Sequence, residues 1–143
     1  MTNWLKTIGG PKGVTLRVVL LIICVYHLGV GLSSTLAPES TLRFAQSFYG
    51  LDVSDSAAQF TYMLKAMGMY ALFTGGLLAL ALRDPKRYRH IVVAAAVLLL
   101  MRAVTRLLFF DLLEQAFGLA WQQNLINVTF LVSKGALLLW TSH

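Results

Sequence analysis

The chain has 143 residues, of which 57% are hydrophobic and only 13% are charged, and its formal net charge is +6. Soluble domains carry about 25% charged residues, so this composition excludes an ordinary soluble domain, a disordered chain and a coiled coil. The single cysteine, Cys24, excludes an intramolecular disulfide and a multi-cysteine metal site. Composition therefore indicates a small integral membrane protein that crosses the bilayer several times.

Four stretches are long and apolar enough to span a bilayer, which takes about 20 residues of α-helix. They cover residues 14–34, 57–82, 91–113 and 117–140. The connections that join the second, third and fourth spans are short, which predicts antiparallel neighbours packed side by side. The predicted fold class is all-α, a four-helix transmembrane bundle that forms a single domain over residues 1–143.

Basic residues gather at one end of these spans. The amino-terminal tail and the connection 83–90 hold seven of the twelve cations, namely Lys6, Lys12, Arg17, Arg83, Lys86, Arg87 and Arg89. The opposite connections are acidic, with Glu39, Asp52, Asp55, Asp111 and Glu114 against Arg43. The positive-inside rule therefore predicts that both termini are cytoplasmic.

The first outer loop, residues 35–56, has the signals of a short amphipathic helix. Pro38 suits a first helical position and Gly50 suits a helix end, with mixed apolar and polar residues between them. Such a helix would lie in the outer interface or pack over the mouth of the bundle. In either place it could act as a lid.

Four cations fall inside predicted spans, namely Lys65, Arg102, Arg106 and Lys134. A cation at the centre of a membrane helix costs about 2.5 to 3.5 kcal/mol on translocon scales. These side chains are therefore expected to face the bundle interior, a water-filled cavity or a partner.

One polar residue from each span is expected at the same depth. Counting inward from the outer ends at about 1.5 Å per residue puts these four residues roughly 10 to 12 Å deep. They are His27, Lys65, Arg106 and Asn124. The four helices would thus contribute to one polar layer.

Further polar residues extend this layer. Arg102 and Asn127 lie slightly deeper, at helical spacings that keep them on the faces of Arg106 and Asn124, and Lys134 continues the stripe. Tyr62, beside Lys65, is a further candidate.

These residues are open to a structural and to a functional interpretation. Backbone carbonyls and the two asparagines can satisfy buried cations without a ligand. However, no acidic residue lies in the middle of a span, so the cations invite an anionic or electron-rich ligand. Candidates are a phospholipid phosphate, a quinone carbonyl, a small oxyanion or an acidic group of a partner, with Arg102 and Arg106 as forked donors and Lys65 as a point charge.

Other kinds of site find no support in the sequence. Neither Cys/His spacing nor paired carboxylates that could bind a metal occur. The basic connection 83–90 lies beside two spans, which favours anionic lipid headgroups over nucleic acid.

Short motifs run through the first three spans: YHLGVG at 26–31, KAMGMY at 65–70, Gly75-Gly76 and RAVTR at 102–106. With the outer loop that contains Pro38, they resemble the small four-helix DoxX-like membrane proteins, particularly their uncharacterised bacterial branches. The resemblance covers nearly the whole chain and implies a four-helix bundle in the bacterial inner (cytoplasmic) membrane. A named member of the family is similar to a subunit of a thiosulfate:quinone oxidoreductase, which implies a quinone near the cationic layer.

The expected function is that of an accessory protein or a subunit of a larger membrane complex, with a lipid-like or quinone-like ligand or a partner's acidic group at the cationic layer. Membrane lipids, other membrane-protein subunits or a second copy are the expected partners. A DoxX-type, quinone-linked oxidoreductase subunit is the alternative, and a small anion transporter is a third hypothesis. Whether the chain is an enzyme stays open, although an accessory or binding role is favoured.

Overall fold

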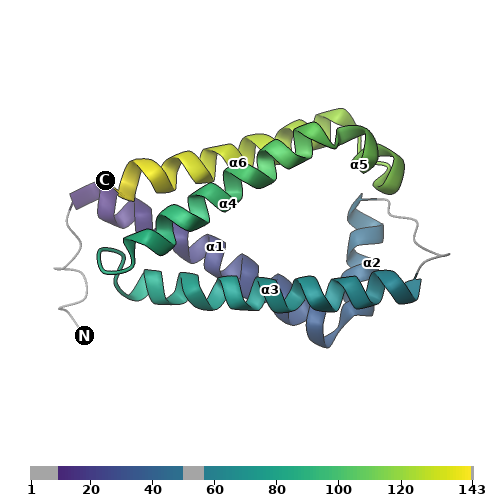
Figure 1. The fold of residues 1–143 in the computed structure, drawn as a ribbon, viewed down its shortest axis with the longest axis horizontal. Coiled ribbons are helices and arrows are strands. Elements are labelled where there is room, and N and C mark those ends of the chain that lie inside the picture. The colour runs from purple at the N-terminus through teal and green to yellow at the C-terminus, as the bar shows by residue number, and fades with distance from the viewer. Residues whose placement is uncertain (1–9, 50–56, 143) are drawn as a thin grey trace.

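Every element is an α-helix in the computed structural model, which describes residues 10–49 and 57–142 (Figure 1). The helices are α1 (Gly10–Leu36), α2 (Pro38–Tyr49), α3 (Ala57–Arg83), α4 (Arg89–Leu108), α5 (Phe110–Phe117) and α6 (Trp121–Ser142). Four of them, α1, α3, α4 and α6, are long and apolar enough to cross a membrane. The predicted four-helix transmembrane bundle is confirmed, and so is the short helix in the first long connection.

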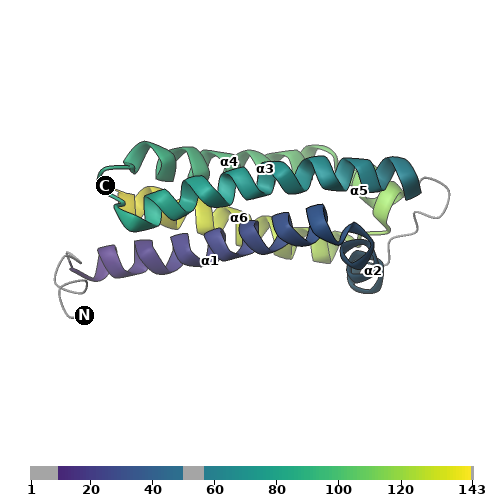
Figure 2. The same cartoon turned by 90° about the horizontal axis from the view of Figure 1, so that it is seen from below.

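The four long helices associate as two pairs, α1 with α3 and α4 with α6. The pairs meet near the start of α1, the end of α6 and the α3–α4 connection, and diverge toward α2 and α5 (Figures 1 and 2). We call these the terminal end and the wide end. The expected row of second, third and fourth spans is confirmed for the last two, since α4 packs against α6. It is wrong for the second span, because α3 packs mainly against α1 rather than against α4.

Glycines let α1 and α3 approach closely. A Cβ atom added at Gly31 would lie 2.9 Å from the backbone oxygen of Gly68, and one added at Gly68 would lie 3.0 Å from the backbone oxygen of Gly31. Two helical turns away along the same interface, the thiol of Cys24 in α1 donates to the backbone oxygen of Gly75 in α3 at 3.4 Å. Small residues at a helix interface allow this distance because no side chain separates the two backbones.

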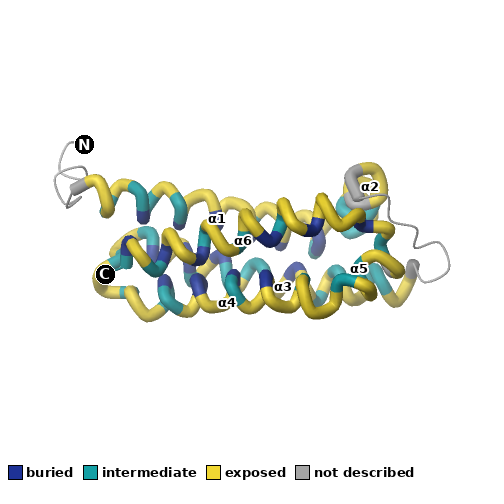
Figure 3. The backbone as a smooth tube through the Cα atoms, turned by 90° about the horizontal axis from the view of Figure 1, so that it is seen from above, coloured by how far each residue is buried: buried dark blue, intermediate teal, exposed yellow. Residues whose placement is uncertain are grey.

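An apolar core closes the terminal end of the bundle. Its most deeply buried large side chains come one from each long helix: Leu20, Leu78, Val92 and Leu138. The ammonium of Lys12 lies 5.0 Å from the ring centroid of Trp140, a cation–π contact between α1 and α6. Buried residues lie where helices face one another, whereas the outer faces are exposed and apolar, as expected for a surface in contact with lipid (Figure 3).

The third and fourth spans are shorter than predicted. Phe109 leaves the helical conformation at φ −111° and ψ 32°, so α4 ends at Leu108 rather than at residue 113. The short helix α5 follows and ends at Phe117, where Gly118 caps it in a left-handed conformation with a φ of 60°. Helix α6 then begins at Trp121 rather than at residue 117. Phe110 packs edge-on against Trp121 with ring centroids 4.8 Å apart, which holds α5 against α6.

Helix α2 stands at the wide end, where it contacts α1 and α3 (Figure 1). Its charged pair, Glu39 and Arg43, is exposed, with 3.9 Å between the carboxylate and guanidinium atoms. This position agrees with the prediction of a helix over the mouth of the bundle.

Candidate functional site: a cationic pocket

A pocket of about 330 Å³ lies between α1, α4 and α6. Its described lining residues are Ile23, Tyr26, His27, Leu99, Arg102, Arg106, Asn127, Phe130, Leu131 and Lys134. We call it the cationic pocket because three of these residues are basic, namely Arg102, Arg106 and Lys134, and none is acidic. Five of the eight predicted site residues line it, and a sixth, Asn124, bonds to one of its arginines.

Arg106 and Asn124 form a reciprocal pair. The Nε atom of Arg106 donates to the Oδ1 atom of Asn124 at 3.0 Å, and the Nδ2 atom of Asn124 donates to the backbone oxygen of Arg106 at 3.2 Å. Arg106 lies in the last turn of α4, and Asn124 lies in the first turn of α6 with 0% of its surface exposed. The pair thus fixes the direction of the guanidinium and also joins the two helices at the wide end.

Arg102 and Lys134 are held differently. Neither makes an ion pair with any residue that the structure describes, and Arg102 has no hydrogen-bond partner among those residues. The ammonium of Lys134 lies 5.9 Å from the ring centroid of Phe130, within cation–π range. Their positive charge is therefore not neutralised by the described part of the chain.

His27 and Asn127 supply the neutral polar groups. The Nδ1 atom of His27 lies 2.8 Å from the backbone oxygen of Ile23, and the Nδ2 atom of Asn127 donates to the backbone oxygen of Gln123 at 2.8 Å. A neutral imidazole that donates through Nδ1 carries its acceptor lone pair on Nε2. The atoms left for other partners are thus His27 Nε2 and Asn127 Oδ1.

Two aromatic residues form the mouth of the pocket. Tyr26 and Phe130 line it and are themselves 55% and 60% exposed, on α1 and α6. Behind them the wall is apolar at Ile23, Leu99 and Leu131. The pocket is therefore amphipathic: its cations, of which Arg102 is itself exposed, lie beside an apolar wall and two exposed aromatic rings.

Two predicted residues do not reach this pocket. Lys65 and Tyr62 lie on α3, outside the lining set, and Tyr62 is 75% exposed. Sequence reasoning missed Tyr26 and Phe130. A signal was present, because Phe130 falls between Asn127 and Lys134 at helical spacing and thus on their face of α6.

Arg106 and Asn124 lie nearer to the ends of their helices than the sequence predicts. Since α4 ends at Leu108 and α6 begins at Trp121, Arg106 and Asn124 lie within one turn of their helix ends. Lys134 lies in the opposite half of α6, eight residues before its end at Ser142. The predicted depth of Arg106 and Asn124 is too great because the outer ends of the third and fourth spans were placed too far out, whereas α1 ends at Leu36, two residues beyond the predicted end of the first span.

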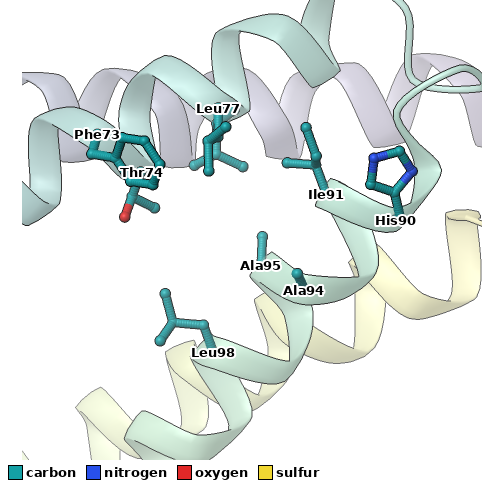
Figure 4. A pocket seen from close by; sticks show the side chains of 9 residues that line it. Phe73, Thr74, Leu77, His90, Ile91, Ala94, Ala95 and Leu98 are labelled. Carbon is teal, nitrogen blue, oxygen red and sulfur yellow. The ribbon is translucent and has the colours of Figure 1, made fainter.

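A second pocket, of about 220 Å³, lies between α3 and α4 and is almost wholly apolar (Figure 4). Phe73 and Leu77 of α3 face Ala95 and Leu98 of α4 across it. Its hydroxyl group, on Thr74, donates to the backbone oxygen of Tyr70 at 2.8 Å. The imidazole of His90 also lines the pocket, but the remaining wall is apolar and suits a lipid chain.

In the described ranges 10–49 and 57–142, no cluster of three or more His, Cys, Asp or Glu residues forms. What the cationic pocket can do chemically is to bind negative charge and donate several hydrogen bonds to it.

Comparison with known proteins gives no match: no family model, no curated protein and no solved structure is similar to this chain. The DoxX-like resemblance therefore stays a prediction and assigns no role to any residue of the pocket. The fold supports the coarser statement that the chain is an integral membrane protein built on four apolar helices.

Proposed function

We propose that this chain is an accessory membrane protein, without catalysis of its own, that binds an anionic, lipid-like molecule in the cationic pocket. The observation that carries the proposal is the concentration of Arg102, Arg106 and Lys134 around one pocket whose described lining includes no acid. A cation at the centre of a membrane helix costs about 2.5 to 3.5 kcal/mol, a cost that bears on Arg102 and Lys134 more than on Arg106, which lies in the last turn of α4. An anion bound among them offsets this cost because it supplies the missing counter-charge.

The shape of the pocket favours an amphiphile over a free ion. A volume of about 330 Å³ is at the small end of ligand sites and holds a headgroup rather than a whole lipid. The apolar wall and the exposed rings of Tyr26 and Phe130 give a hydrocarbon tail a way out into the bilayer. We therefore place the headgroup among the cations and the tail at the aromatic mouth.

A quinone is the second candidate. Tyr26 and Phe130 suit packing against a planar ring, and the arginines can donate to its carbonyl oxygens. This is the site that a DoxX-type, quinone-linked oxidoreductase subunit would need. A neutral quinone leaves the charge of Arg102 and Lys134 uncompensated, which is why we rank it below an anionic lipid.

Transport of a small anion is the weakest of the three functions. A path through the bundle would have to continue from the pocket to the terminal end. There the apolar core around Leu20, Leu78, Val92 and Leu138 fills the space between the helices.

We further propose that the protein resides in the bacterial inner membrane with both termini in the cytoplasm. The support is the positive charge at the terminal end, which holds five basic residues: Lys12, Arg83, Lys86, Arg87 and Arg89. In this orientation the wide end faces outward and the pocket opens in the outer half of the bilayer. The acidic group of another membrane subunit, or of a second copy, is the alternative source of counter-charge.

Native mass spectrometry of the protein purified in mild detergent tests the proposal. We expect an anionic lipid to remain bound to the wild type and to be lost from Arg102→Leu and Lys134→Leu. Lys65→Leu is the matched control, because it removes a cation from a membrane span outside the pocket. Equal lipid retention in all variants would refute the assignment of the pocket, and a co-purified quinone would favour the second candidate.

A further inference from the structure

We infer that the cationic pocket selects a lipid whose headgroup ends in a phosphomonoester, rather than the phosphodiester of common bilayer lipids. The inference rests on the proposed function. It adds the charge of the headgroup and the number of unesterified oxygens on its phosphate. It follows from the count of cations, from their placement on two helices, and from the polar atoms that surround them.

The charge count comes first. Arg102, Arg106 and Lys134 bring three positive charges to one pocket, and neither Arg102 nor Lys134 has an acidic partner among the described residues. A phosphodiester carries a single negative charge, whereas a phosphomonoester carries about −1.5 to −2 at neutral pH. Nearby cations favour the doubly charged form. A terminal phosphate therefore neutralises more of the pocket than a diester does.

The placement of the donors gives the second argument. Arg102 and Arg106 lie one turn apart on α4, and Lys134 reaches the same pocket from α6. One guanidinium fork already engages two phosphate oxygens, which is all that a diester leaves unesterified. A monoester has three such oxygens, so an oxygen remains for Lys134 after the fork of Arg102 has engaged two.

The site is also partly built in advance. Asn124, wholly buried, accepts from Arg106 Nε at 3.0 Å and so fixes the guanidinium before any ligand arrives. His27, with Nδ1 committed to the backbone of Ile23, has Nε2 left to accept a hydrogen bond.

The test compares two lipids that differ by one methyl group. The purified wild-type protein is titrated in detergent with dioleoyl phosphatidic acid and, separately, with dioleoyl phosphatidylmethanol, whose phosphate is capped as a methyl ester. We expect phosphatidic acid to bind about tenfold more tightly, as one additional charge-assisted contact provides. Equal affinity for the two lipids would overturn the inference while leaving the proposed function intact, and absence of binding by both would overturn both.

Variants and a competitor complete the design. Arg102→Leu and Lys134→Leu should each reduce the preference for phosphatidic acid, whereas Lys65→Leu should keep it; an unchanged preference in both pocket variants would contradict the assigned donors. Inorganic phosphate distinguishes a lipid site from a free-phosphate site. We expect millimolar inorganic phosphate not to displace phosphatidic acid, and displacement would show that the pocket recognises phosphate without its lipid.

Discussion

The close approach of α1 and α3 leaves no room for a methyl group at Gly31. A Cβ atom there would lie 2.8 Å from the backbone nitrogen of Leu72 and 2.9 Å from the backbone oxygen of Gly68. Backbone atoms cannot rotate away as a side chain can. The two helices would have to move apart by roughly 0.6 Å to restore an ordinary contact of about 3.5 Å.

Gly29, in the same helix, provides the matched control because a Cβ atom there meets nothing within 4 Å. Both Gly29→Ala and Gly31→Ala gain about 0.5 to 1 kcal/mol of helix stability from lost backbone freedom in the unfolded chain. Only Gly31→Ala also overpacks the interface, which costs about 1 to 3 kcal/mol. The difference between the two variants therefore isolates the steric cost.

The assay is unfolding of both variants in the same detergent, by heat or by added sodium dodecyl sulfate, followed by circular dichroism. Gly31→Ala should be about 1 to 3 kcal/mol less stable than Gly29→Ala. Equal stability of the two would refute the close approach of the backbones. The pair Gly75→Ala and Gly76→Ala repeats the comparison from α3, because a Cβ atom at Gly75 meets Leu28 and one at Gly76 meets nothing.

Three further predictions concern the wide end and the topology. Asn124→Leu removes a hydrogen-bond partner of Arg106 and should lower the free energy of unfolding by about 1 to 3 kcal/mol in the same assay; a variant as stable as the wild type would contradict the pair. Gly118→Ala puts a side chain at φ 60° and should lower the free energy of unfolding by about 1 to 2 kcal/mol, and Gly118→Asn should lower it less. Equal melting temperatures of Gly118→Ala and the wild type would argue against the left-handed turn. In a background without the native cysteine, Gln46→Cys should react with a membrane-impermeant maleimide on intact cells and Lys86→Cys only after lysis. The reverse pattern would invert the predicted orientation.

The spans could be predicted from the sequence because hydropathy and length suffice to define a membrane helix. The end of α4 could not, because the segment around Phe109 contains no glycine or proline and continues the apolar run. The break there accompanies a tertiary contact, the edge-on packing of Phe110 against Trp121. Gly118 was the local signal for the second boundary, since it ends α5 in a left-handed conformation.

The candidate site was predictable in part for a similar reason. The spacing of Arg102 and Arg106, and of Asn124 and Asn127, fixes a common helix face, and the structure turns those faces toward one pocket. Lys65 was placed with them by depth alone. Depth along a helix can be counted from the sequence, but the choice of neighbours cannot: α3 packs against α1 through its glycines, and the pocket forms among α1, α4 and α6.

The two pocket arginines of α4 differ in their roles: the bond of Arg106 to Asn124 points to a structural role, whereas Arg102 has no such bond. Arg106 contributes to the fold, because its bond to Asn124 joins α4 to α6 at the end that lies beyond the apolar core. Arg102 makes no hydrogen bond or ion pair with a described residue, so in the free protein its charge costs stability. A ligand that binds only the folded protein adds about 2.7 kcal/mol of stability when present at a hundred times its dissociation constant. Under the proposed function, Arg102 therefore adds to stability only in the ligand-bound protein, whereas loss of Arg106 would weaken both the fold and the binding. Effects on ligand retention are thus interpretable at Arg102 and Lys134, whereas at Arg106 they are mixed with effects on the bundle.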